Sequence, residues 1–347
     1  MTSFSPFIIP IFLAHQGCPH QCVFCNQHVI TRDSGQRTQV GIREVKKEID
    51  TCLDWPRDKK RQVQVAFYGG SFTGLNHFLQ EELLGAVQSY VEAGQVHSIR
   101  VSTRPDYIDR NTAVFLKEYN VGIVELGVQS MDHKVLAVSN RGHSRDHVEK
   151  AFHLLKGAGL EVGGQLMIGL PGETVAGVLD GARQLAALRP DMVRIYPTLV
   201  IRGSQLAKMF IRREYQPMSL DKAVALCVRL KGYFDSEGIP VIRMGLQPSA
   251  SLEKDMLAGP YHPAFGELVL SRMFFHRMRD LLRIRQDIGK GSSMTITMAA
   301  SDRSQFQGMK KCNLKRLESL HLLDGVEIVY SAEQERGTIE VFEKVLS

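Results

Sequence analysis

The first 245 residues alternate between two patterns, and this alternation constrains the fold more than any other feature of the sequence. Short apolar or β-branched runs, which predict strands, are followed by stretches with apolar residues at three- and four-residue spacing, which predict helices. The strand runs are Phe7 to Ala14, Val63 to Tyr68, Ile99 to Thr103, Val121 to Leu126, Val162 to Ile168 and Val193 to Tyr196. Because such alternation produces right-handed βαβ units, the sequence predicts one parallel sheet with helices outside it.

Six such units fit a partial (βα)6 barrel or an open doubly wound sheet, and in both architectures ligands bind where strands end and loops begin. A further helix (220–235) and a short run (241–244) follow, and then the alternation ends. Residues 246–290 are expected to be helical, 294–299 to form a strand, 314–320 a short helix, and 326–330 with 338–342 a hairpin. We therefore predict an α/β domain over residues 1–245 and a small C-terminal α+β extension over residues 246–347.

The excess positive charge of the chain is confined to the predicted extension. The whole chain of 347 residues has a net charge of +6, whereas residues 272–316 contain eleven basic and three acidic side chains, a net charge of +8. This basic segment is either a polyanion-binding face or a solvated, salt-bridged surface. Its basic residues are Arg272, Arg277, Arg279, Arg283, Arg285, Lys290, Arg303, Lys310, Lys311, Lys315 and Arg316.

No targeting or membrane segment is expected. The apolar run from Phe7 is interrupted by Pro10, no Lys or Arg precedes Arg32, and no apolar run approaches the roughly 20 residues of a membrane span. A soluble, cytoplasmic protein is the expectation, and in that compartment thiols stay reduced. The six cysteines are too few for a disulfide framework, so clustered ones predict metal binding or catalysis.

Three of the cysteines lie within eight residues. Cys18, Cys22 and Cys25 form a Cys-x3-Cys-x2-Cys pattern directly after the first predicted strand. Three thiolates can hold an iron–sulfur cluster, which leaves one iron free to bind a small molecule. A structural zinc site completed by His15, His20 or His28 is the alternative. The isolated Cys52, Cys227 and Cys312 are expected to be small buried hydrophobic residues.

The segment GCPHQCVFC at the end of a first strand resembles the cluster motif of the radical S-adenosylmethionine (radical SAM) enzymes. The resemblance implies a partial TIM-like (βα)6 barrel in which the three cysteines of the loop 15–28 hold a 4Fe-4S cluster. It also implies that SAM chelates the open iron, that Phe24 packs near the adenine, and that reductive cleavage gives a 5′-deoxyadenosyl radical. In such enzymes the cofactors supply the reactivity, and the protein supplies orientation and the exclusion of water.

Further positions match SAM-contacting positions of this family, each at or after the end of a predicted strand. The turn YGGSFTG follows the second strand, where the resemblance implies that Gly69, Gly70 and Ser71 receive the SAM amino group. The third to fifth strands lead to Ser102, Gln129 and Gln165, and SNRGH contains Arg141. Ser102 replaces a frequent Glu, and Gln165 stands at a position that is often acidic. The catalytic residues beyond these contacts are not identified by the sequence.

Ordered motifs over residues 7–270, among them STRPDYID, ELGVQSMD and IYPTLVIRGSQL, resemble the radical SAM portion of Elongator protein 3. The resemblance implies that the substrate is an RNA, with transfer RNA (tRNA) bound through the basic segment. It also implies an electron donor such as flavodoxin or ferredoxin. The length leaves no room for the acetyltransferase domain of that protein, so its complete reaction is not expected here.

Two other functions remain open. A nucleic-acid-binding protein with a structural zinc would use the basic segment for phosphate contacts and would have no radical chemistry. An enzyme resembling oxygen-independent coproporphyrinogen III oxidase would share the cluster type, but its relatives carry a further cysteine at the position of Gln27. Metal analysis distinguishes the zinc protein from the radical SAM enzyme.

Overall fold

In a computed structural model, the chain forms two compact units, one of residues 1–223 with 230–261 and the other of residues 224–229 with 262–347. The structure describes residues 6–13, 16–18, 22–26, 40–56, 58, 60–288 and 292–345. None of the helices within these residues combines the length and the apolar character that a membrane crossing needs.

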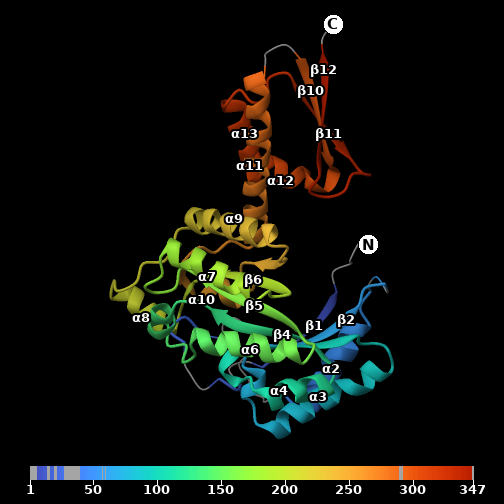
Figure 1. Cartoon of the computed structure of the whole chain (residues 1–347), viewed down its shortest axis with the longest axis vertical. Coiled ribbons are helices and arrows are strands. Elements are labelled where there is room, and N and C mark those ends of the chain that lie inside the picture. Colours follow the sequence, from blue (N-terminus) through green and yellow to red (C-terminus); the bar gives the residue numbers. More distant parts are fainter. Residues whose placement is uncertain are drawn as a thin grey trace. The chain divides into compact units, whose positions relative to one another are not determined.

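The first unit is built on a curved, entirely parallel sheet of seven strands in the order β1-β2-β3-β4-β5-β6-β8. The predicted partial (βα)6 barrel is confirmed, with the predicted run at 241–244 as the seventh strand. Helices α2, α3, α4 and α6 lie along one side of the sheet (Figure 1). The strands are β1 (Phe7–Phe12), β2 (Val63–Tyr68), β3 (Ser98–Thr103), β4 (Val121–Gln129), β5 (Glu161–Ile168), β6 (Met192–Pro197) and β8 (Val241–Met244).

Helices connect successive strands of the sheet, as the alternation in the sequence predicts. Several of them begin at a capping side chain: that of Ser144, for example, accepts a hydrogen bond from the backbone N–H of His147 at the start of α6. The helices are α2 (Ile42–Leu53), α3 (His77–Glu92), α4 (Arg110–Glu118), α5 (His133–Val138), α6 (Arg145–Gly157), α7 (Val175–Ala187), α8 (Gln205–Ile211), α9 (Leu220–Ser236) and α10 (Ala250–Asp255). Short strands β7 (Val200–Ile201) and β9 (Met256–Ala258) pair antiparallel.

Side chains alternate between the two faces of the sheet, since successive residues of a strand point in opposite directions. In β2, Val63, Val65 and Phe67 are buried in the apolar core. On the other face, Gln64 accepts a hydrogen bond from Arg100 of β3, and the Tyr68 hydroxyl donates to Glu125 of β4. The concave face of the sheet is therefore unusually polar, and it is this face that forms the site described below.

The second unit packs helices against one face of a small sheet. Phe274, Met278, Ile296 and Phe306 belong to one buried apolar cluster that joins α11, β10 and α12. The elements are α11 (Phe265–Ile288), β10 (Ser292–Ala299), α12 (Arg303–Gln307), α13 (Cys312–Ser319), β11 (Val326–Ser331) and β12 (Ile339–Val345). In Figure 1 these elements are orange to red.

Two details of the predicted extension are wrong. Strands β11 and β12 do not form a hairpin, because β10 lies between them, parallel to β11 and antiparallel to β12. Residues 246–290 are not wholly helical, since β9 interrupts them. In both cases a strand that pairs with a distant part of the chain overrides the local pattern, which depends only on neighbouring residues.

Candidate active site

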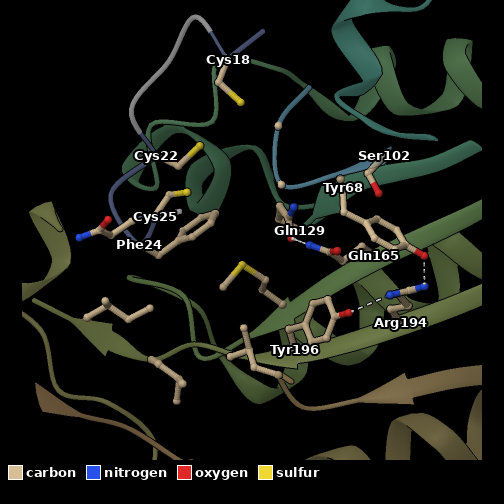
Figure 2. Close-up of a pocket in the computed structure, with 18 of the residues that line it drawn as sticks. Cys18, Cys22, Phe24, Cys25, Tyr68, Ser102, Gln129, Gln165, Arg194 and Tyr196 are labelled. Atoms are coloured by element: carbon tan, nitrogen blue, oxygen red, sulfur yellow. Dashed lines mark hydrogen bonds between the residues drawn. The ribbon is translucent and has the colours of Figure 1, made fainter. Parts of the chain in front are cut away.

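A cavity of about 1470 Å³ opens within the concave side of the sheet in the first unit. The interior of a closed (βα)8 barrel is filled by bulky apolar side chains, whereas this one is hollow and lined by both apolar and polar side chains. Ten of the eleven site residues expected from the sequence line it: Cys18, Cys22, Phe24, Cys25, Gly69, Gly70, Ser102, Gln129, Arg141 and Gln165. Ser71 does not line it. The structure thus brings together residues from four strand ends and the cysteine segment (Figure 2).

The three cysteines enter this cavity from the segment that follows β1. Cys22 is buried, and Cys18 and Cys25 are half-buried. A turn joins the last two, in which the backbone N–H of Cys25 donates to the carbonyl oxygen of Cys22 at 3.0 Å. Burial raises the pKa of the Cys18 thiol, and Cys22 adds to that shift, while Arg104 and Arg141 oppose it.

The donor set suits an iron–sulfur cluster in its chemistry, since three soft thiols face one cavity. Within the described part of the chain, no three His, Cys, Asp or Glu side chains are gathered closely enough to hold a metal ion. Figure 2 shows Cys18 apart from Cys22 and Cys25, so cluster binding by all three requires their sulfurs to converge. The alternative zinc ligands His15, His20 and His28 lie outside the described residues.

Glycines hold the cysteine segment against the turn after β2. The backbone of Gly17 packs so closely on the turn that a Cβ on Gly74 would overlap the Gly17 carbonyl group. A Cβ on Gly70 would likewise overlap the carbonyl oxygens of Leu13 and Gln16. The backbone N–H of Ser71 donates to the carbonyl oxygen of Gln16 at 3.0 Å. The YGGSFTG motif therefore fixes the start of the cysteine segment, in addition to lining the cavity.

Ser71 performs this role from a fully buried position. Its hydroxyl lies 3.0 Å from that of Thr103 and accepts a hydrogen bond from the backbone N–H of Arg104 at 3.3 Å. These contacts tie the turn after β2 to the end of β3. Ser71 thus supports the site by holding two of its loops together, and its hydroxyl does not face the cavity.

Arg141 connects the cysteine segment to the sheet. Its Nη1 donates to the sulfur of Cys22 at 3.1 Å and its Nη2 donates to the carbonyl oxygen of Gly127 at 2.7 Å. The side chain is only 6% exposed, and its Nε, among the described residues, has no hydrogen-bond partner. An unsatisfied buried donor costs about 1 to 3 kcal/mol, so this position favours an acceptor supplied by a ligand.

Two glutamines face each other at neighbouring strand ends. The Nε2 of Gln165, on β5, donates to the Oε1 of Gln129, on β4, at 3.2 Å (Figure 2). Gln129 is buried and has a left-handed backbone, with φ of 66°. That conformation costs a residue other than glycine about 1 kcal/mol or more, and such strain is concentrated at functional sites. Ser102, at the end of β3, lines the same cavity.

Helix α8 supports the cysteine segment from the opposite side. The backbone N–H of Leu206 donates to the carbonyl oxygen of Val23 at 2.6 Å, and the Asn26 amide donates to the carbonyl oxygen of Arg202 at 2.8 Å. Phe24 packs against an apolar cluster that includes Val200 and Leu206. The Phe24 side chain is therefore held at the cavity wall, and its contact with an adenine stays a prediction.

An ion-pair network in the cavity was not predicted from the sequence. Glu125 of β4 lies between two arginines, 2.6 Å from Nη1 of Arg100 on β3 and 2.7 Å from Nε of Arg194 on β6. Arg194 also donates to the hydroxyls of Tyr68 at 3.0 Å and Tyr196 at 3.2 Å (Figure 2). Burial, followed by the charge of Glu125, raises the pKa of Tyr68 to about 12. The Tyr68 hydroxyl therefore stays protonated near neutral pH.

The sequence does contain a signal for this network. Arg100, Glu125 and Arg194 are the charged residues within three of the strand runs that are otherwise apolar or uncharged. A charge in the middle of a buried strand requires a partner, because leaving it unpaired in the interior costs several kcal/mol. Pairing these three positions with one another would have followed from that rule.

Family comparisons agree with this geometry. A family model described as the radical SAM superfamily matches residues 13–185, and one described as the radical SAM C-terminal domain matches residues 190–274. An uncharacterised protein of Methanocaldococcus jannaschii is 28% identical over 229 residues, which are 63% of this chain and 69% of that protein. A tRNA uridine(34) acetyltransferase of Methanocaldococcus infernus is 37% identical over 127 residues, 36% of this chain and 24% of that enzyme.

Among solved structures, the Elp3 of Methanocaldococcus infernus with an N-terminal deletion has the same fold. It superposes with a TM-score of 0.59 at 23% identity, over 78% of this chain and 63% of that one. The chain thus matches about a quarter of the acetyltransferase and less than two thirds of the Elp3 structure. The two family models lie in order along the sequence and together cover about three quarters of it, and the chain accordingly belongs to the radical SAM superfamily of enzymes, which use a 4Fe-4S cluster and S-adenosylmethionine.

Proposed function

We propose that Cys18, Cys22 and Cys25 bind a 4Fe-4S cluster and that the chain reductively cleaves SAM at the mouth of the barrel. The observation that carries this proposal is the entry of all three cysteines into one cavity, on the edge of the sheet where its strands end. Parallel α/β folds use that edge for ligands. When bound there, the reduced cluster and SAM would supply the 5′-deoxyadenosyl radical.

The chain's own groups would bind and orient SAM. Arg141 has an unsatisfied buried Nε that would donate to a carboxylate or ribose oxygen, and Gln129 and Gln165 offer amide groups on two neighbouring strands. Gly69 and Gly70 allow the backbone to approach the ligand closely. Phe24 offers an apolar face for the adenine, supported by α8. Ser102 completes the proposed contacts.

We propose RNA, and tRNA in particular, as the substrate class. The support comes from relatives that modify tRNA by name and from the basic segment of the C-terminal unit, which suits a polyanion. A flavodoxin or ferredoxin would supply the electron. A cytoplasmic location fits these proposals, because that compartment keeps the three thiols reduced.

Anaerobic reconstitution tests the chemistry directly. We expect about four irons per chain, in keeping with a 4Fe-4S cluster, and formation of 5′-deoxyadenosine on addition of dithionite and SAM. Replacement of Cys18, Cys22 or Cys25 by Ala removes both, whereas Cys312→Ala, an exposed cysteine elsewhere in the chain, leaves both unchanged.

The same experiment decides against the proposal if well-folded protein binds no iron and forms no 5′-deoxyadenosine. Binding of one zinc ion in place of iron would indicate the structural zinc protein instead. The substrate class is tested separately, by comparing the nucleosides of tRNA from cells with and without the gene. Identical nucleosides in both would rule out tRNA modification.

A further inference from the structure

A pair of short helices in the second unit has the form of a helix–turn–helix. Helices α12 and α13 are joined by the four-residue turn 308–311 and pack with α11 around one apolar cluster. Gly308 has φ of 71°, and a Cβ there would lie 2.8 Å from the sulfur of Cys312. Helix pairs joined by such a turn often bind nucleic acids, with the N-terminal residues of the second helix nearest to the ligand.

Lysines occupy this end of α13. Lys310, Lys311 and Lys315 are all exposed, and we call them the lysine turn. Lys310 and Lys311 have φ of 52° and 60°, a left-handed conformation that costs about 1 to 2 kcal/mol per residue. Strain of this kind is retained where the surrounding structure enforces it, often at binding sites. Here it places two ammonium groups at the start of α13.

Helix α13 presents no amide side chain that could read a base. Its single amide, that of Asn313, is buried and donates to the carbonyl oxygens of Ser271 and Gln305 at 3.1 Å and 3.0 Å. Asn and Gln are the usual readers of adenine edges, whereas lysines and a guanidinium that is already stacked, such as that of Arg316, suit phosphate contacts. The exposed side of α13 therefore suits contacts with the backbone of a nucleic acid and carries little base specificity.

A second group of cations lies where α13 meets α11. The guanidinium of Arg316 stacks 4.7 Å from the centre of the Phe275 ring. Arg272, Arg279 and Arg316, which we call the arginine cluster, all act electrostatically on His276, and burial together with these charges lowers the pKa of His276. The carboxylate of Asp280 opposes this lowering of the His276 pKa, and its Oδ1 lies 2.7 Å from Nη2 of Arg279. A stacked guanidinium is already oriented for a phosphate.

We propose that the lysine turn and the arginine cluster form a docking surface for the phosphodiester backbone of double-stranded RNA stems. Stems of RNA are recognised through backbone and shape, because their deep major groove excludes side chains, and the cations of α13 and α11 suit contacts with phosphates. The choice of RNA over DNA also rests on the proposed function.

The test is a fluorescence anisotropy titration of the full chain with a labelled RNA hairpin at about 50 and about 200 mM salt. The double variant Lys310→Gln/Lys315→Gln is expected to lower the affinity at least tenfold and to reduce the logarithmic salt dependence by about two. The matched control, Lys46→Gln/Lys47→Gln, removes the same charge from exposed positions of α2 in the first unit and is expected to change the affinity less than twofold. Arg316→Lys keeps the positive charge but loses the planar guanidinium that stacks on Phe275, and it is expected to weaken RNA binding about threefold or more.

Equal losses in the lysine variant and its control would overturn the proposal, because binding would then depend on total charge alone. Tighter binding to a DNA duplex of the same sequence than to the RNA hairpin would overturn the assignment to RNA. Formation of 5′-deoxyadenosine without RNA is measured on the same variants and is expected to stay unchanged. Loss of RNA binding with intact SAM cleavage therefore separates failure of the docking surface from failure of the proposed radical chemistry.

Discussion

The guanidinium of Arg141 lies 3.1 Å from the sulfur of Cys22, although 118 residues separate them in the chain. This contact joins the cysteine segment to the loop between α5 and α6 and places a positive charge beside a proposed cluster ligand. Hydrogen bonds to the sulfurs and nearby charge are the main means by which a protein sets the potential of an iron–sulfur cluster. The contact therefore has a measurable electrochemical consequence.

Replacing Arg141 by Gln is expected to make the reduction potential of the reconstituted cluster more negative, since the more negative reduced state loses a neighbouring cation. Affinity for SAM should fall as well. Potentials are measured by titration followed by electron paramagnetic resonance. Arg145→Gln, which removes an exposed ion pair with Glu149, is the control. An unchanged potential and SAM affinity in Arg141→Gln would contradict the assignment.

Gly74→Ala is expected to displace the cysteine segment, because the new methyl group overlaps the Gly17 carbonyl group. Overpacking of this kind costs about 1 to 3 kcal/mol, and iron content after reconstitution should fall with it. Gly85→Ala is the matched control. Gly85 lies inside α3 with open space around its Cβ position, so alanine there should stabilise the helix by about 0.5 to 1 kcal/mol.

The two glycine variants are compared by urea unfolding, with the fluorescence of Trp55 as the signal. Trp55 is the only tryptophan of the chain and lines the cavity of the first unit. Its emission therefore follows the unit that contains the site. If Gly74→Ala were as stable as the unaltered chain and bound as much iron, the close packing of the two segments would not be needed.

Glu125→Gln is expected to lower the free energy of unfolding by about 3 to 5 kcal/mol, because it leaves two buried arginines without their carboxylate. Glu149→Gln breaks an exposed pair of comparable chemistry and should cost less than about 1 kcal/mol. Urea denaturation of both variants measures the difference. Similar small losses would mean that water, rather than Glu125, solvates the two guanidinium groups.

Acid should destabilise the fold through His143. Burial, with Arg141 and Arg104, lowers the pKa of His143 to about 3, and Asp106 opposes the shift. Its Nε2 lies 3.1 Å from the carbonyl oxygen of Val128. Below the ordinary value of 6.5, the unfolded chain takes up a proton that the folded chain does not. Stability is therefore lost as the pH falls from 6.5 towards 3, by up to about 1.4 kcal/mol per pH unit.

His143→Gln retains a donor for the Val128 carbonyl oxygen and removes the titration. Between about pH 7 and pH 5, the unaltered chain should lose more stability to urea than this variant. Above about pH 6.5 the free energies of unfolding of the unaltered chain and of His143→Gln should change in parallel with pH. A variant with the same loss on acidification would place the acid sensitivity elsewhere.

The strands of the barrel could be predicted because their signal is local. The run Val63–Tyr68 is strand β2 to the residue, since β-branched and aromatic side chains suit a half-buried strand. The cysteine segment was found because three thiols in eight residues are rare outside metal sites. Such features need no knowledge of which strands become neighbours.

What could not be predicted depends on distant pairs. The overlap of Gly17 with Gly74 and the sharing of Glu125 by two arginines require the register of strands that are far apart in sequence. Cys312 was expected to be buried and is exposed, because it begins α13 on its solvent side. Cys52 and Cys227 are buried as expected, since each lies on the inner face of a long amphipathic helix.

The open barrel leaves two end strands, β1 and β8, each with one row of backbone groups that no other strand of the described sheet covers. Such edges invite strands from other molecules, and proteins protect them with residues that cannot continue a ladder. Pro10 lies in the middle of β1 and has no N–H to donate. The same residue that breaks the N-terminal apolar run thus helps the β1 edge of an unclosed barrel to resist self-association through strand addition.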